Sequence, residues 1–289
     1  MPKSYYWIAA LFLTVLSCRH AGNSEQEDYI PETDRSKTRE AIDVIYAMNL
    51  PTDVVSLFEK TGTGFNAALL IHSENVAVYE APEQMALLLG ALGVDLSYCK
   101  LYGQAEHAAG LYRHIEMLAE RLQIPEDVFT RTRNDIEAII EKPDSMTSMI
   151  TEIYSSADAH FKSVGQEALA SLSLLGGWLE AMYIGVNIYQ DKKILEVGDR
   201  ILHQKYALTS LLGLLNNYQE SLFIRQYVHD LEKLRSLFNE VEILYASDNF
   251  DMEAGENSFR AQNAVLRYSP ETLAEICSSV LGLRNKIMP

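Results

Sequence analysis

The chain has 289 residues, of which 48% are hydrophobic and 22% charged, and its formal net charge is −16 at pH 7. An acidic excess of this size repels phosphate backbones, and no cluster of Lys or Arg offsets it locally, so binding to nucleic acid is not expected. The cysteines show neither a CxxC pair nor a Cys/His spacing, which argues against a zinc site.

The first 17 residues have the order of a secretory signal. Lys3 supplies a positive charge, and every residue from 5 to 16 except Thr14 is apolar, before the small residue Ser17. A membrane-spanning helix needs about twenty apolar residues to cross roughly 30 Å of hydrocarbon, and this run is too short for that. We therefore expect residues 1–17 to be a signal peptide that is removed.

The leader ends in Val15-Leu16-Ser17-Cys18, which resembles the lipobox of bacterial lipoproteins. In that motif the cysteine receives diacylglycerol before cleavage, so the resemblance implies that Cys18 is lipidated and anchors the protein to a membrane. The alternative is an ordinary signal peptide with an incidental cysteine. Arg19 rather than Asp follows the cysteine, which by similarity to enterobacterial sorting rules favours the outer membrane and leaves the leaflet open.

The rest of the chain divides into a tether and a body. Residues 18–37 are polar and acidic, contain Pro31 and lack apolar periodicity, so we expect a flexible lipidated tether. In residues 38–289 apolar side chains recur three and four positions apart, and alternating runs are nearly absent. This pattern predicts one all-α domain built as an antiparallel multi-helix bundle.

The apolar periodicity also predicts the individual helices. Residues 166–189 form the most apolar segment, which we expect at the centre of the bundle. Ser269 and Pro270 are expected as the N-cap and the first residue of the last helix. Residues 66–77 are ambiguous, and residues 246–268 are expected to form a loop. The predicted helices cover residues 39–48, 54–60, 83–103, 104–122, 125–141, 143–162, 166–189, 194–216, 220–244 and 270 onward.

Two stretches, residues 88–98 and 174–183, look alike. Both place two leucines and glycines before an acidic residue, with a tyrosine three positions after it. The spacing of about 85 residues suggests duplication of a helical unit, and a chance match between two apolar helices is the alternative. A glycine inside a helix costs about 1 kcal/mol relative to alanine, so close helix packing is the expected reason for the glycines, with ligand contact as the alternative. These are Gly90, Gly93, Gly176 and Gly177.

Asp95 and Glu180 are the acidic residues set deepest in apolar helical sequence. Because burial of a lone carboxylate is costly, each needs a partner, and Tyr98 and Tyr183 lie one turn away on the same faces. The two acids either face a shared pocket with aromatic walls or belong to a structural network between helices, which we favour. The candidate pocket residues are Asp95, Tyr98, Tyr102, Trp178, Glu180 and Tyr183, with Tyr189 as a further wall.

No motif for a nucleophile, a nucleotide or a metal is present, including GxSxG, HExxH and the phosphate-binding loop. His107 and His114 are seven residues apart, but no Glu-x-x-His pair accompanies them. We therefore predict no cofactor and no metal. Cys99 and Cys277 fall in apolar helical patterns, where a free cysteine behaves as a small hydrophobic residue, and a disulfide between them is the alternative.

The lipobox, the acidic tether and the LGVDLSY stretch at residues 92–98 together resemble uncharacterised all-helical lipoproteins of Bacteroides-type bacteria. The resemblance implies an envelope location and a helical fold, and no activity comes with it. We expect a membrane-tethered binding module for an envelope protein or a small-molecule ligand. One alternative is an envelope hydrolase that uses Asp95 and Glu180 as acid and base, which requires a shared, water-accessible cleft with the carboxyl groups within about 10 Å. Another is a purely structural spacer, which predicts no pocket.

Overall fold

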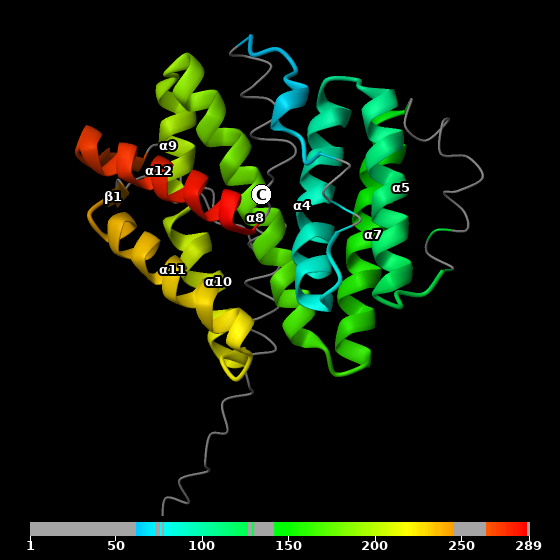
Figure 1. The fold of residues 1–289 in the computed structure, drawn as a ribbon. Coiled ribbons are helices and arrows are strands. Elements are labelled where there is room, and N and C mark those ends of the chain that lie inside the picture. The colour runs from blue at the N-terminus through cyan, green and yellow to red at the C-terminus, as the bar shows by residue number, and fades with distance from the viewer. Residues whose placement is uncertain are drawn as a thin grey trace, which may run out of the picture. The chain divides into compact units, whose positions relative to one another are not determined.

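Helices make up most of the chain that the computed structural model describes, which confirms the predicted all-α helical bundle (Figure 1). The described residues are 62–72, 76, 78–126, 129, 142–245 and 264–287. All of them belong to the unit Thr38–Pro289. The leader, Cys18, the tether, the helices expected at 39–48 and 54–60 and most of the helix expected at 125–141 lie outside the described residues.

The observed helices begin and end close to the predicted positions over most of the chain. Ser269 caps the last helix as predicted, since its Oγ accepts a hydrogen bond from the Thr272 N–H at 3.0 Å. The helices are α4 (Pro82–Leu101), α5 (Ala105–Arg121), α7 (Pro143–Ser163), α8 (Glu167–Lys192), α9 (Leu195–His203), α10 (Lys205–Leu215), α11 (Leu222–Asn239) and α12 (Pro270–Ile287), with 3-10 turns η2 (Ala67–Leu69) and η3 (Asn216–Tyr218).

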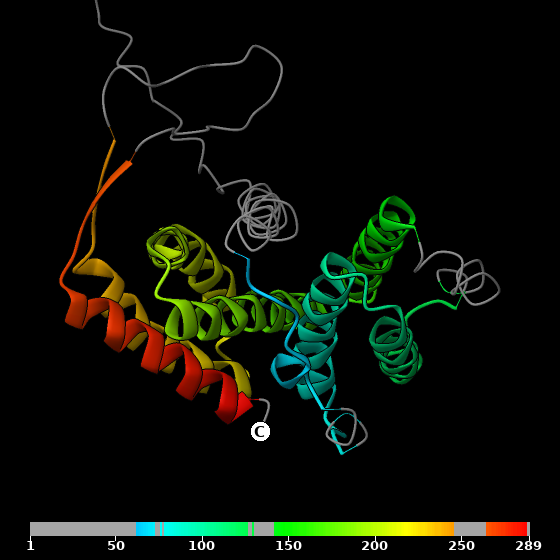
Figure 2. The same cartoon turned by 90° about the horizontal axis from the view of Figure 1, so that it is seen from above.

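Helix α8 is the centre of the bundle, as its composition predicts. It contacts α4 and α7 as well as α9, α10 and α12, and Figure 2 shows it between these two groups of helices. By length and composition α8 is the one described helix that could cross a membrane, but 89% of its apolar window is buried inside the protein. A helix that is apolar on all faces and covered by others is a core helix.

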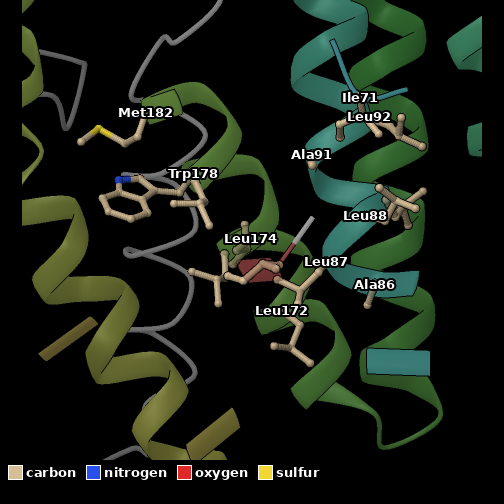
Figure 3. Packing of buried hydrophobic residues seen from close by; sticks show 14 of the residues in the cluster. Ile71, Ala86, Leu87, Leu88, Ala91, Leu92, Leu172, Leu174, Trp178 and Met182 are labelled. Atoms are coloured by element: carbon tan, nitrogen blue, oxygen red, sulfur yellow. The ribbon is translucent and has the colours of Figure 1, made fainter. Parts of the chain in front are cut away.

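The predicted close packing of glycines is confirmed where α4 and α8 cross. A Cβ added to Gly90 would lie 1.8 Å from the Ser173 carbonyl oxygen, and one added to Gly176 would lie 1.9 Å from that of Leu87. The contact is reciprocal: Gly90 approaches the residue three positions before Gly176, and Gly176 approaches the residue three positions before Gly90. Figure 3 shows the leucines of α4 and α8 that pack around this crossing. The duplication itself stays a prediction.

The helix predicted over residues 194–216 is two helices, α9 and α10, separated at Gln204. The Gln204 N–H donates to the Ile201 carbonyl in a tight turn, and its side-chain oxygen accepts a hydrogen bond from Trp178 Nε1 of α8 at 3.1 Å. The break therefore coincides with a contact between helices, which a local apolar pattern does not reveal.

The helix predicted over residues 220–244 ends at Asn239, and a strand follows it. Strand β1 (Glu242–Tyr245) pairs antiparallel with β2 (Ala264–Arg267), and Figure 2 shows both strands running side by side away from α11 and α12. Ile243 and Leu266 pack against the core. The β-branched and aromatic residues at this point favour a strand, and pairing with β2 overrides the helical spacing. We call this pair of strands the ribbon.

Candidate functional site

The two acids expected deep in the bundle are both completely buried, with 0% of their surface exposed. Helix α8 places Glu180 against Arg284 of α12, which donates from Nε to Oε2 at 3.0 Å and from Nη2 to Oε1 at 3.3 Å. The guanidinium carbon also lies 4.4 Å from the centre of the Tyr183 ring. This two-pronged ion pair, stacked on an aromatic ring, gives a buried carboxylate the charged partner it requires.

Arg284 is a charged partner that the sequence did not lead us to expect. It belongs to the inward stripe of α12, because it follows Cys277 and Val280 at helical spacing and precedes Ile287 by three residues. An arginine at a core position is a signal for a buried acid elsewhere in the fold. The spacing identifies the arginine, but it cannot tell that the acid is Glu180, 104 residues away.

Asp95 of α4 has a different environment. Its Oδ2 accepts a hydrogen bond from the Ile71 N–H at 2.7 Å, and Oδ1 has no hydrogen-bond partner among the residues that the structure describes. Burial raises the pKa of Asp95 well above its usual value, and the nearby charge of Glu180 raises it further, against the Ile71 N–H and Arg284. The net effect is that the neutral form of Asp95 is favoured over a wider pH range than in an exposed carboxyl group.

Glu180 keeps closer to its charged form because of its direct partner. Burial raises the pKa of the Glu180 carboxyl, and Arg284 lowers it through both charge and hydrogen bonds, with a net rise. The arrangement separates the two acids chemically: Glu180 is paired with a cation, while Asp95 receives a single backbone N–H.

Tyr98 of α4 and Tyr102 just after the helix hold the segment that precedes the helix. We call residues 62–71 the strap. The Tyr98 hydroxyl accepts a hydrogen bond from the Asn66 N–H at 3.2 Å, and the Tyr102 hydroxyl shares one with Thr63 at 3.2 Å. The Phe65 ring stacks on Tyr98 with a centroid distance of 5.4 Å. Tyr98 and Tyr102 therefore contact the strap of the same chain.

The remaining predicted wall residues lie elsewhere. Trp178 points from α8 away from α4 and donates to Gln204 (Figure 3). Tyr189 lies near the end of α8, where Lys193 Nζ is 5.2 Å from the centre of its ring. The structure thus brings Glu180 and Tyr183 together at Arg284, and it places Asp95, Tyr98 and Tyr102 at the strap.

Metal and thiol chemistry have no support within the described part of the chain. No group of three or more His, Cys, Asp or Glu side chains there is placed to hold a metal ion. Cys99 and Cys277 are free and buried. Burial raises the pKa of the Cys99 thiol to about 12 and that of Cys277 to about 11, so both remain protonated and behave as small apolar groups.

The ribbon offers a second candidate surface, on its outward face. Leu244 and Val265 lie directly opposite each other across the strands, and they are 40% and 59% exposed. Next to them Arg267 Nη1 lies 3.8 Å from Glu242 Oε2. This face therefore presents an apolar pair beside two charges that pair with each other.

Three places in the described part of the fold are candidate functional sites: the buried carboxyl groups, the strap and the ribbon. Each is defined by contacts within this chain. The chain matches no protein-family model, no curated protein and no solved structure.

Proposed function

We propose that this chain is a lipid-anchored, non-enzymatic helical module of the bacterial envelope that binds another envelope protein. The observation that carries the non-enzymatic part is the complete burial of Asp95 and Glu180, with Glu180 paired to Arg284. A general acid or base must reach the reacting group directly or through one water molecule. Carboxyl groups without exposed surface do not meet that requirement.

The anchor is proposed from the leader. Residues 5–16 are long enough for export and too short to span a bilayer, and Val15-Leu16-Ser17-Cys18 follows. Acyl chains on Cys18 contribute about 0.8 kcal/mol per buried methylene, so more than one chain holds the protein firmly. The tether at residues 18–37 then separates the body from the membrane, and the outer membrane is the proposed destination.

Metabolic labelling with an alkyne fatty acid in a Bacteroides-type host tests the anchor. We expect the full chain to be labelled and to enter the detergent phase, and Cys18→Ser to lose both properties. Cys99→Ser is the matched control and should keep the label, because Cys99 is a buried core residue. An unlabelled full chain, or a label that survives in Cys18→Ser, contradicts the proposal.

The hydrolase alternative is tested on the same protein. We expect no turnover of a panel of chromogenic glycosides and esters by the purified full chain. An acid–base mechanism requires activity that falls sharply in both Asp95→Asn and Glu180→Gln, since each carboxyl would have its own role. Turnover that falls sharply in both variants would show that the protein is a hydrolase and would contradict the proposed non-enzymatic function.

The ribbon is the surface we propose for the partner. Its outward charges, Glu242 and Arg267, are paired with each other, so Leu244 and Val265 are left to face an apolar group. An extended apolar segment of an envelope protein fits such a face, because it can pair with an edge of the ribbon, which has two strands among the described residues, and bury its side chains.

Photocrosslinking in cells tests this surface. A photoreactive amino acid at Val265 should give one discrete crosslinked species. Val164, which is 51% exposed at the end of α7, is the matched control and should not give it. Equal patterns at the two positions, or no crosslink at Val265, would contradict binding through the ribbon.

A further inference from the structure

The strap is held on α4 by a ladder of polar side chains. Asp95 and Tyr98 of α4 and Tyr102, the residue that follows the helix, are spaced three and four residues apart, and each has a hydrogen bond with the strap. Two of these bonds are donated by strap backbone N–H groups, from Ile71 and Asn66. The Ile71 and Asn66 N–H groups therefore receive from these side chains the hydrogen bonds that a helix or sheet would otherwise supply.

The three side chains that hold the strap differ chemically. Tyr98 and Tyr102 contribute neutral phenol groups, whereas Asp95 contributes a carboxyl group that is 0% exposed. Its second oxygen, Oδ1, has no hydrogen-bond partner in the described part of the chain. A carboxylate in this position would bury a charged oxygen without a hydrogen bond, whereas the cost for a neutral carboxyl group is smaller.

We propose that the strap is a latch, closed while the Asp95 carboxyl group is neutral and opened more often as that group ionises. Opening frees Asp95 to meet water, and it uncovers Tyr98 of α4 and Tyr102 just after the helix. Leu69, Leu70 and Ile71 are buried when the latch is closed, so closure also hides apolar surface. The ionisation of one carboxyl group is thereby coupled to exposure of an apolar and aromatic face.

The charged surroundings of Asp95 support this coupling. Glu180 of α8 and Arg284 of α12 act on its charge, and Tyr98 and Cys99 of its own helix respond to it. Burial and Glu180 raise the pKa of Asp95 and outweigh Arg284 and the Ile71 N–H. In the open strap the carboxyl group meets water and its pKa returns toward about 3.9. At a pH between the pKa of the open form and that of the closed form, Asp95 is ionised in the open form and neutral in the closed form.

Amide hydrogen exchange of the full chain in detergent tests the latch. In measurements from pH 5 to 9, corrected for the intrinsic rate, protection of the strap amides should decrease as pH rises toward the pKa of the closed form, by at most tenfold per pH unit, because one proton is released on opening. Protection in α11, which lies outside the ladder, is the internal control and should not follow this slope. Constant strap protection across this range in the unmodified chain would overturn the latch.

Two variants distinguish the effect of the Asp95 charge from the effect of losing a hydrogen bond to the strap. Asp95→Asn retains the shape and the acceptor for the Ile71 N–H, so strap protection should become independent of pH. Tyr98→Phe removes one rung without changing a charge, so protection should fall at every pH with the slope unchanged. A slope that persists in Asp95→Asn overturns the proposal. Should Asp95→Asn fail to fold, the unmodified chain and Tyr98→Phe still decide, since a flat profile in both overturns it.

Discussion

Substitution of Gly176 by alanine should separate the two helices at the centre of the bundle. The added Cβ would lie 1.9 Å from the Leu87 carbonyl oxygen, whereas real Cβ contacts essentially never fall below 3.0 Å. The atom in the way is backbone, so α4 and α8 must move apart by about 1 Å at their crossing, which forfeits a quarter to a half of each dispersion contact there. We expect a loss of about 3–5 kcal/mol, above the usual ~1–3 kcal/mol for overpacking, because the obstructing atom is backbone and cannot change rotamer.

Alanine also favours the helix by about 1 kcal/mol, so the net loss for Gly176→Ala should be about 2–4 kcal/mol. Two glycines of the same helix give a graded control. At Gly177 the added Cβ would lie 3.3 Å from the Gly90 carbonyl oxygen, and at Gly185 nothing lies within 4 Å. We expect a small effect for Gly177→Ala and a gain of up to about 1 kcal/mol for Gly185→Ala.

Urea unfolding followed by circular dichroism, with thermal melting as a second measure, gives these free energies. For a domain of 150–250 residues the net loss in Gly176→Ala corresponds to a fall in Tm of at least about 4 °C. Equal unfolding free energies for Gly176→Ala and Gly185→Ala would refute the inferred backbone contact between α4 and α8.

Three further predictions concern individual polar contacts. Arg284→Met should lower the free energy of unfolding by about 3–5 kcal/mol, because it leaves Glu180 buried and unpaired, and the double variant with Glu180→Met should recover much of that loss in urea titrations. For Asp95 the folded-state pKa is raised, so its stabilising contribution is full below the unfolded pKa of about 3.9 and is lost as pH rises toward the folded value. Asp95→Asn should therefore match or exceed the unmodified chain in stability at pH 7, and a steeper decline with pH in the variant would contradict this. Ser269→Ala should cost about 1 kcal/mol by removing the cap on the Thr272 N–H, as measured by thermal melting, and an unchanged Tm would argue against the cap.

Residue patterns in the sequence predicted the buried acids of the candidate site but not their partners. Asp95 and Glu180 were identified correctly as buried acids in need of partners, since their own helices are apolar on every side. Their partners were not identified from the sequence, because Arg284 lies 104 residues from Glu180 and Ile71 contributes only a backbone N–H. Backbone groups carry no sequence signal, and pairing between distant helices depends on how they cross.

The sequence by itself determined the helical class, the central place of α8 and the cap at Ser269, because apolar periodicity, all-round hydrophobicity and N-cap chemistry are local properties. Only the tertiary structure decided the break at Gln204, the pairing of β1 with β2 and the attachment of the strap to α4. Each of these depends on a contact between residues far apart in the chain. Long-range contacts of this kind override local preference when they satisfy buried polar groups or bury a strand face.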